Sequence, residues 1–176
     1  MKNIILKNGI IAGIIVSIFM GLSVFYHSKN LENPTTSYIL GFTGMFLAFA
    51  FTFVGMNQYK KANNGVISFG KAFIIGFLIA FIISTIYVGV WLIEYYNFYP
   101  DFYEKFVASE IKNLQSSGLN QTELQEKIKE LNNLKESCKS PLYLIMITFS
   151  EILPFGIIFS LIGAIIFGFI LKKKKN

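Results

Sequence analysis

The chain contains no arginine, one cysteine and one histidine. All sixteen basic residues are lysines, whereas base readout and forked contacts to phosphate groups rely mainly on arginine. We therefore expect no nucleic-acid partner, although the net charge is +6. Cys138 by itself cannot form an intramolecular disulfide, and Cys138 with His27 is too small a set for a zinc site built from paired cysteines or several histidines. We expect no metal ion and no cofactor.

Charged residues are few, and they lie in blocks. Of the 176 residues, 15% are charged and 53% are hydrophobic. This apolar fraction is more than the core of a water-soluble protein of this length would hold. The charged blocks alternate with long apolar runs, as in proteins with several membrane spans. The sequence predicts a single all-α membrane domain over residues 1–176, a bundle of four transmembrane helices at about residues 9–26, 38–56, 69–95 and 142–171.

Small residues recur at every fourth position of the apolar runs. Residues four apart share one face of a helix, so each span carries a smooth stripe that a neighbouring backbone can approach closely. Close contact of this kind is how helices associate in lipid. The predicted helix-packing positions are Gly9, Gly13, Ser17, Gly21, Gly44, Ala48, Thr52, Ala72, Gly76, Ala80, Ser84, Gly156, Ser160, Ala164 and Gly168.

The first apolar run has an alternative interpretation as a secretory signal peptide. Lys2 and Lys7 precede the run, and Gly21-Leu22-Ser23 resembles a weak cleavage site. The run is long for the core of a signal peptide, however. Its stripe of small residues can serve helix packing only if the helix stays in the protein. We therefore favour a retained first span.

Residues 100–140, between the third and fourth spans, differ in composition from the apolar runs. Two stretches with a helical apolar period flank Ser116-Ser117-Gly118, and Asn120 with Glu123 resembles a capping box at the second start. We predict an amphipathic helical hairpin outside the bilayer, lying on the bundle or on a partner. The alternative is a solvated helix pair without a partner. The apolar positions are Phe102, Tyr103, Phe106, Val107, Ile111, Leu114, Leu124, Ile128, Leu131 and Leu134.

Short local signals mark the connections between the spans. Asn33-Pro34 favours a turn and disfavours helix at the residue before the proline. Asn63-Asn64-Gly65 is a turn signal, and Ser68 is placed to cap the third span. Within the last apolar run, Pro154 removes a backbone hydrogen bond and can kink the helix.

Lysines and acidic residues separate onto two sides of the predicted bundle. All ten acidic residues fall on one side or at its interface. The other side holds both termini and the connection after the second span, and its nine lysines are Lys2, Lys7, Lys60, Lys61, Lys71 and residues 172–175. The positive-inside rule then places both termini in the cytoplasm. The chain is rich in lysine, asparagine, isoleucine and phenylalanine and lacks arginine, a composition that indicates a genome of low GC content. We therefore expect a bacterial protein and, with these spans, an inner-membrane location.

Three ionisable residues are predicted to lie at one depth. His27, Glu94 and Glu151 are 20, 23 and 21 residues from the lysines at positions 7, 71 and 172, which places each near the outer interface. One histidine and two carboxylates at one level form a set that can titrate together, bind a cation or relay protons. The simpler interpretation is that each side chain reaches headgroup water independently.

Two short stretches, one span apart, are Asn63-Asn64-Gly65-Val66-Ile67-Ser68-Phe69-Gly70-Lys71-Ala72 and Tyr99-Pro100-Asp101-Phe102. They resemble a family of four-span bacterial membrane proteins that is catalogued as a domain of unknown function and is common in the Bacteroidetes. The resemblance covers most of the chain, from Lys7-Asn8-Gly9 to the last span. It implies four spans with an outer helical segment between the third and fourth. It implies no activity and no site residues.

Two functional hypotheses follow. The sequence has no Gly-rich phosphate loop, no nucleophile flanked by partners and no metal-ligand spacing, so we expect a protein that is not an enzyme and has no catalytic residues. The favoured hypothesis is a structural or interaction protein, with residues 100–140 docking a protein partner or a second copy. The alternative is a small transporter or proton-coupled channel that uses Glu94, Glu151 and His27.

Overall fold

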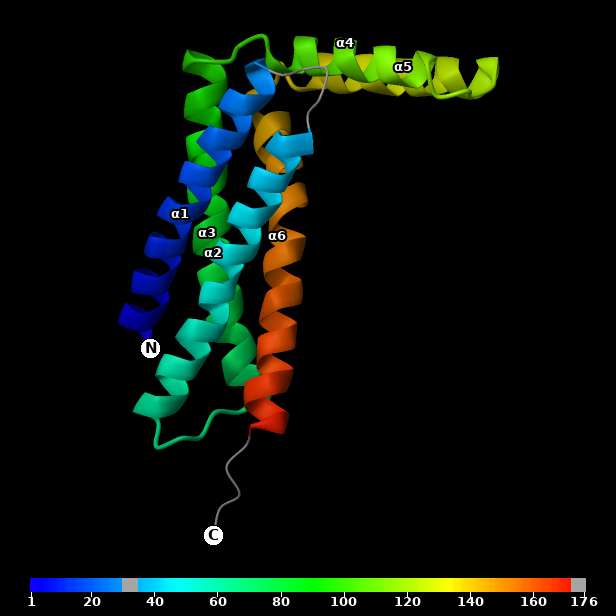
Figure 1. Ribbon diagram of the computed structural model, residues 1–176. Coiled ribbons are helices and arrows are strands. Elements are labelled where there is room, and N and C mark those ends of the chain that lie inside the picture. Colours follow the sequence, from blue (N-terminus) through cyan, green and yellow to red (C-terminus); the bar gives the residue numbers. More distant parts are fainter. Residues whose placement is uncertain (30–34, 172–176) are drawn as a thin grey trace.

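The computed structural model describes residues 1–29 and 35–171, and this part of the chain is almost entirely helical. Four long helices lie side by side, and two shorter ones project from one end of the bundle (Figure 1). The last long helix continues into a short π-helical segment, η1. The elements in chain order are α1 (Lys2–Lys29), α2 (Thr35–Ala62), α3 (Phe69–Asn97), α4 (Phe102–Gln115), α5 (Gln121–Ser137), α6 (Pro141–Ile165) and η1 (Ile166–Ile170).

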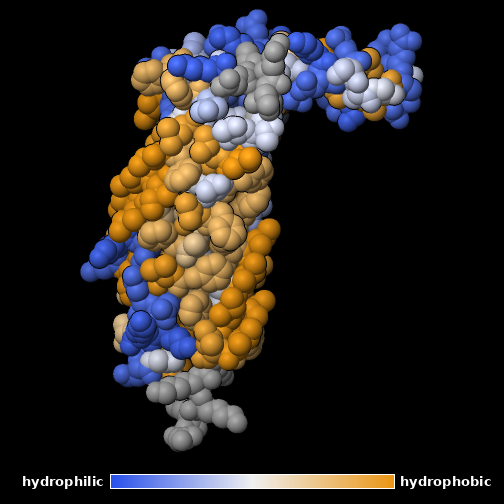
Figure 2. Space-filling model, viewed as in Figure 1, coloured by the Kyte–Doolittle hydropathy of each residue, from blue (hydrophilic) through white to orange (hydrophobic). Residues whose placement is uncertain are grey.

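Four of these helices are long and apolar enough to cross a membrane: α1, α2, α3 and α6 together with η1. The outer surface of the bundle carries large apolar side chains, among them Ile18, Phe46 and Ile93, which are 58%, 65% and 60% exposed. Figure 2 shows this apolar surface on the bundle and a hydrophilic surface on the projecting helices. A bundle with an apolar outside is what lipid requires. The predicted four-span, all-helical membrane fold is confirmed.

The first two spans are longer than predicted at both ends. With 28 residues each, α1 and α2 are about 42 Å long at roughly 1.5 Å per residue, against a hydrocarbon core of about 30 Å. The extra turns contain polar residues that pair between helices: the Asn8 side-chain amide donates to the Ile4 carbonyl and to Gln58 Oε1, each at 2.8 Å. The predicted span bounds left residues 27–37 as the first connection, and this is wrong in part, because α1 continues to Lys29 and α2 begins at Thr35. The Asn33-Pro34 signal lies outside the described residues.

The predicted caps and turns are confirmed where the structure describes them. The Ser68 hydroxyl accepts a hydrogen bond from the Lys71 amide at the start of α3. Asn120 Oδ1 accepts from the Glu123 amide at 2.9 Å at the start of α5. Asn64 and Gly65, with φ of 53° and 80°, form the turn between α2 and α3. These local signals therefore set where the helices begin.

The helix order places α1 and α6 at opposite corners of the bundle. Each of them packs against both α2 and α3, and α2 and α3 also contact one another. The core runs along this middle pair, with Phe49 and Met56 of α2 and Ile75, Ile79 and Ile83 of α3 fully buried. At the end of α6, the Lys60 ammonium donates to the Leu171 carbonyl at 2.6 Å. The lysines at 172–175, predicted to end the last span, lie outside the described residues.

The small-residue stripes face the helix interfaces, and all the predicted positions except the half-buried Ser17 and Gly21 are buried. At most of these glycines, a side chain of a neighbouring helix fills the space where a Cβ would be. A Cβ at Gly44 would overlap Phe19 of α1, and a Cβ at Gly9 would lie 2.8 Å from the Ile82 Cβ of α3. The bulky side chain of one helix therefore inserts where its neighbour has no side chain.

Direct backbone contact occurs in η1, the continuation of α6. A Cβ at Gly168 would lie 2.6 Å from the Cα of Phe69, at the start of α3. At Gly156, a Cβ would lie 2.6 Å from the Ala80 Cβ, so here a small residue faces another small residue. The expectation that backbones meet along every stripe is thus corrected. At the other interfaces bulky residues fill the space beside the glycines, because close van der Waals packing decides how helices associate in lipid.

The helices α4 and α5 contact one another and point sideways from the bundle, at the end opposite the start of α1 (Figure 1). They are joined through a turn with Gly118 at φ of 74°. We call α4 and α5 the hairpin, and the end of the bundle from which they project the hairpin end. In the fourth span, α6 continues through Pro154 without a break in the helix.

We expect Gly44→Ala to destabilise the bundle by about 1–3 kcal/mol, the usual cost of overpacking, because the new methyl group would collide with the Cβ of Phe19, which is fixed to its backbone. Gly89→Ala is the matched control, since no atom lies within 4 Å of its added Cβ. Thermal unfolding of both variants in mild detergent measures the difference. Equal midpoints would contradict the insertion of Phe19 at Gly44.

Candidate functional site

A cavity of about 420 Å³ lies at the hairpin end of the bundle. Residues from α1, α2, α3 and α6 form its walls, and the hairpin covers it with residues of α4 and with Leu134 of α5. Most of its lining surface is apolar. On α6 the lining residues Ile147, Thr148 and Glu151 precede Gly156, the first residue of the small-residue stripe of that helix.

Aromatic rings form much of the cavity lining, and they pack against one another across helices. Trp91 of α3 contacts Phe102 of α4 edge-to-face, with ring centroids 5.0 Å apart. Phe102 stacks on Phe106 at 6.2 Å. Such pairs stabilise beyond the area they bury, so the rings hold α4 over the cavity. The aromatic residues of the lining are Tyr38, Phe42, Tyr87, Trp91, Phe102, Tyr103 and Phe106.

Glu151 is the only charged residue that lines this cavity among the described residues. It lies on α6, three residues after Thr148, and it is exposed. Among the described residues, no lysine forms an ion pair with it. The nearby hydroxyl of Thr148 is already committed, since it donates to the Leu144 carbonyl at 2.7 Å. The carboxylate therefore faces the cavity without a counter-charge from the part of the chain that the structure describes.

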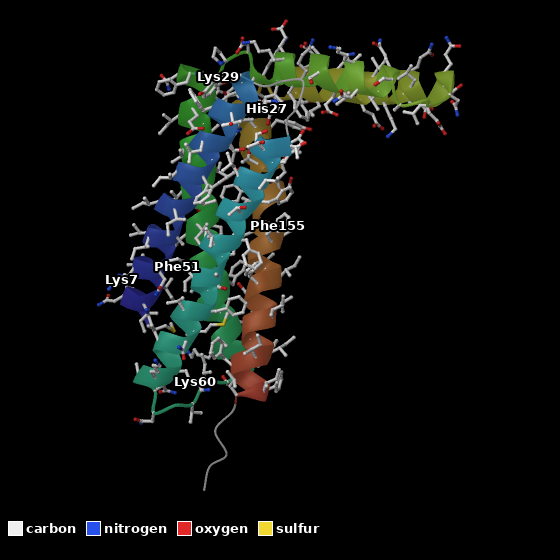
Figure 3. All side chains as sticks on the ribbon, in the orientation of Figure 1. Lys7, His27, Lys29, Phe51, Lys60 and Phe155 are labelled. Carbon is white, nitrogen blue, oxygen red and sulfur yellow. The ribbon has the colours of Figure 1, made fainter. Side chains whose placement is uncertain are left out.

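His27 does not line this cavity. Figure 3 shows it at the hairpin end, far from Lys7 and Lys60, and only 8% of it is exposed. Its ring packs against Phe102, with centroids 5.5 Å apart, and against Phe106 and Tyr38. Its Nε2 atom is buried with no hydrogen-bond partner among the described residues.

Glu94 occupies a third environment, between α3 and α1. Its Oε1 atom lies 3.0 Å from the point where a Cβ of Gly21 would be, so the carboxylate uses the space left by that glycine. Its Oε2 atom is buried without a hydrogen-bond partner among the described residues. The structure thus places the three predicted residues at one end of the bundle, but of the three only Glu151 lines the cavity.

The aromatic cavity lining was not predicted from the sequence. The signal was present, because aromatic residues concentrate near the ends of the second and third spans and at the start of the hairpin. In the structure, Trp91 and Tyr87 line the space between the helices.

A bundle of four apolar helices with lipid-compatible sides defines an integral membrane protein with several spans. The chain matches a known protein family over residues 7–168 and belongs to it; the family is described as "Protein of unknown function (DUF4199)". This match confirms the resemblance found in the sequence. No curated protein and no solved structure matches the chain.

Cys138, at the end of α5, lies next to Tyr103 of α4, which lines the cavity. Its side chain is fully buried next to Tyr103, and burial raises the pKa of the Cys138 thiol, an effect that the Tyr103 hydroxyl only partly offsets. Burial likewise raises the pKa of Tyr103. Because the thiolate is the reactive form, Cys138 is protected by both its position and its protonation.

We expect native Cys138 to react with a maleimide on the order of 100-fold more slowly than an exposed cysteine, which corresponds to a local opening free energy of about 2.8 kcal/mol. The comparison is Ser117→Cys in a Cys138→Ser background, because Ser117 is exposed. Labelling rates followed by intact-protein mass spectrometry measure the difference. Similar rates for the two cysteines would show that the base of the hairpin is open.

Proposed function

We propose that the protein is a non-enzymatic structural protein of a bacterial inner membrane, in which the hairpin docks a second copy of the chain. The observation that carries this proposal is the exposed position of the hairpin. It extends away from the bundle (Figure 1), and α5 contains no buried residue.

The hairpin does not bury its own apolar residues fully. Val107 is 2% exposed, but the other residues along the contact between α4 and α5 are only half-buried, namely Ile111, Leu114, Leu124, Ile128, Leu131 and Leu134. A pair of helices of 14 and 17 residues has one narrow contact, and helices of this length gain most of their stability from tertiary packing. A second hairpin laid against the first supplies that packing, as in a four-helix bundle.

The charges of the hairpin favour a second copy over a strongly charged partner. Residues 101–139 contain seven acidic residues and six lysines, a net charge of −1. Two of the pairs are already formed within the chain: Asp101 with Lys105 and Glu136 with Lys139, each at 2.6 Å. The lysines hold the pKa values of Asp101 and Glu136 below their usual range. A nearly neutral surface with both signs does not repel its own copy, and two-fold dimers are the commonest oligomers.

We expect the wild-type chain to be a dimer in mild detergent and the variant Lys127→Glu/Lys129→Glu/Lys135→Glu to be a monomer. Each reversal changes the hairpin charge by two, so the net charge falls from −1 to −7, and like-charge repulsion should weaken association by on the order of tenfold or more. Native mass spectrometry and light scattering measure the oligomeric state.

A complementary variant separates repulsion from misfolding. Glu123→Lys/Glu126→Lys/Glu130→Lys raises the net charge of the hairpin to +5 and should also be monomeric alone. Mixed with the first variant it should form a heterodimer, because the opposite charges then attract. A monomeric wild-type chain, or homodimers of both variants as stable as the wild type, would overturn docking of a second copy.

We further propose that both ends of the chain and the α2–α3 turn face the cytoplasm. Supporting this, Lys7 and Lys60 lie at the end of the bundle opposite the hairpin (Figure 3), as the positive-inside rule requires of a cytoplasmic end. Alkaline phosphatase fused at Gly118 should be active in the periplasm, and green fluorescent protein fused at the C-terminus should fluoresce. The reversed pattern would contradict this orientation.

A further inference from the structure

We propose that the cavity at the hairpin end binds an amphiphilic cation: a molecule with an apolar body and one onium group, such as a protonated amine. Glu151 supplies the counter-charge, and the aromatic lining receives the apolar body. This inference stands apart from docking by the hairpin, since it concerns the inside of the bundle and holds for one copy of the chain.

The size of the cavity suits a small molecule. Its volume of about 420 Å³ lies within the range of roughly 300–1,000 Å³ found for ligand pockets, which are mostly apolar with a few placed polar groups. Here the walls are largely apolar and Glu151 is the one charged lining group among the described residues.

The charge of the lining disfavours an anion. A carboxylate at membrane depth is costly without a partner and is by default a candidate for ligand binding; Glu151 pairs with no lysine among the described residues. Two hydroxyl groups of the lining donate within the protein: Ser23 to the Ser37 carbonyl and Thr148 to the Leu144 carbonyl, each at 2.7 Å. These donors are therefore not available to an anionic ligand.

The aromatic rings favour a cation as well as an apolar body. The face of a tryptophan, tyrosine or phenylalanine ring attracts an onium group, and most strongly when water is excluded. Trp91 and Tyr87 line the cavity from α3, while Phe102 and Phe106 line it from the hairpin. A ligand with separate apolar and cationic parts satisfies the rings and the carboxylate together.

The cavity is accessible from the side of the bundle. On α2, the lining residues Tyr38 and Phe42 are 45% and 59% exposed, and on α6 Glu151 is exposed. The opening therefore lies between α2 and α6, on the surface that faces lipid. A lipophilic cation that is already dissolved in the bilayer can reach Glu151 by this route directly from the lipid.

Trp91 provides a direct measurement, because it is the only tryptophan of the chain and it lines the cavity. We expect tetraphenylphosphonium to change the fluorescence of Trp91 saturably in protein reconstituted into zwitterionic nanodiscs. Tetraphenylborate has nearly the same shape and the opposite charge, and it should bind at least about tenfold more weakly, as a cation-selective site requires.

Two pairs of variants test the site. Glu151→Gln should raise the dissociation constant of tetraphenylphosphonium about tenfold, whereas Glu130→Gln, which alters an exposed carboxylate of α5 that does not line the cavity, should leave it unchanged. Gly41→Leu should block binding by filling the cavity, since Gly41 lines it and an added Cβ meets only the Ser23 hydroxyl, at 3.4 Å. Gly89→Leu is its control, with open space around the added Cβ.

The outcomes are decisive in either direction. Binding of the cation that is lost in Glu151→Gln and Gly41→Leu but kept in both controls supports the proposal. Equal binding of the cation and the anion, unchanged binding in Glu151→Gln, or the absence of any saturable change at Trp91 in folded wild-type protein overturns it. Gel filtration of each variant in detergent verifies folding, and none of these results depends on whether the hairpins dimerise.

Discussion

Lipid tails are as apolar as leucine, so helices in a bilayer gain little from burying apolar side chains and associate through close fit. In this bundle the fit is between bulky side chains and glycines. Phe19 fills the space at Gly44, and Ile82 fills the space at Gly9. Each insertion fixes both the height and the rotation of a helix. On α6 the cavity residues lie before Gly156, where the small-residue stripe of that helix begins.

The sequence was sufficient for the number of spans, the long connection between the third and fourth spans and the caps. Long apolar runs and local signals such as Ser68 and Asn120 depend on nearest neighbours in the chain, which the sequence displays directly. The ends of α1 were missed for the opposite reason. Asn8 is helical and buried because it donates to Gln58, fifty residues away, and no local pattern announces such a partner.

The candidate site was harder to predict because counting residues along a helix gives height but not direction. His27, Glu94 and Glu151 were placed at one level, yet Glu94 faces α1 at Gly21 while Glu151 faces the cavity. The aromatic lining is drawn from several helices, and no spacing in the sequence connects Tyr38 with Trp91 or Phe102. The sequence predicts where polar groups lie along the membrane normal; tertiary packing decides which of them meet.

The length of the spanning helices has a mechanical consequence. α1, α2 and α3 have 28, 28 and 29 residues, more than a bilayer of ordinary thickness requires, and long helices adapt to a thinner membrane by leaning over. The hairpin leaves the bundle sideways at one end (Figure 1), so leaning of the bundle would lift or lower its tip relative to the lipid surface. The height of the hairpin tip above the lipid is therefore geometrically coupled to the tilt of the whole bundle.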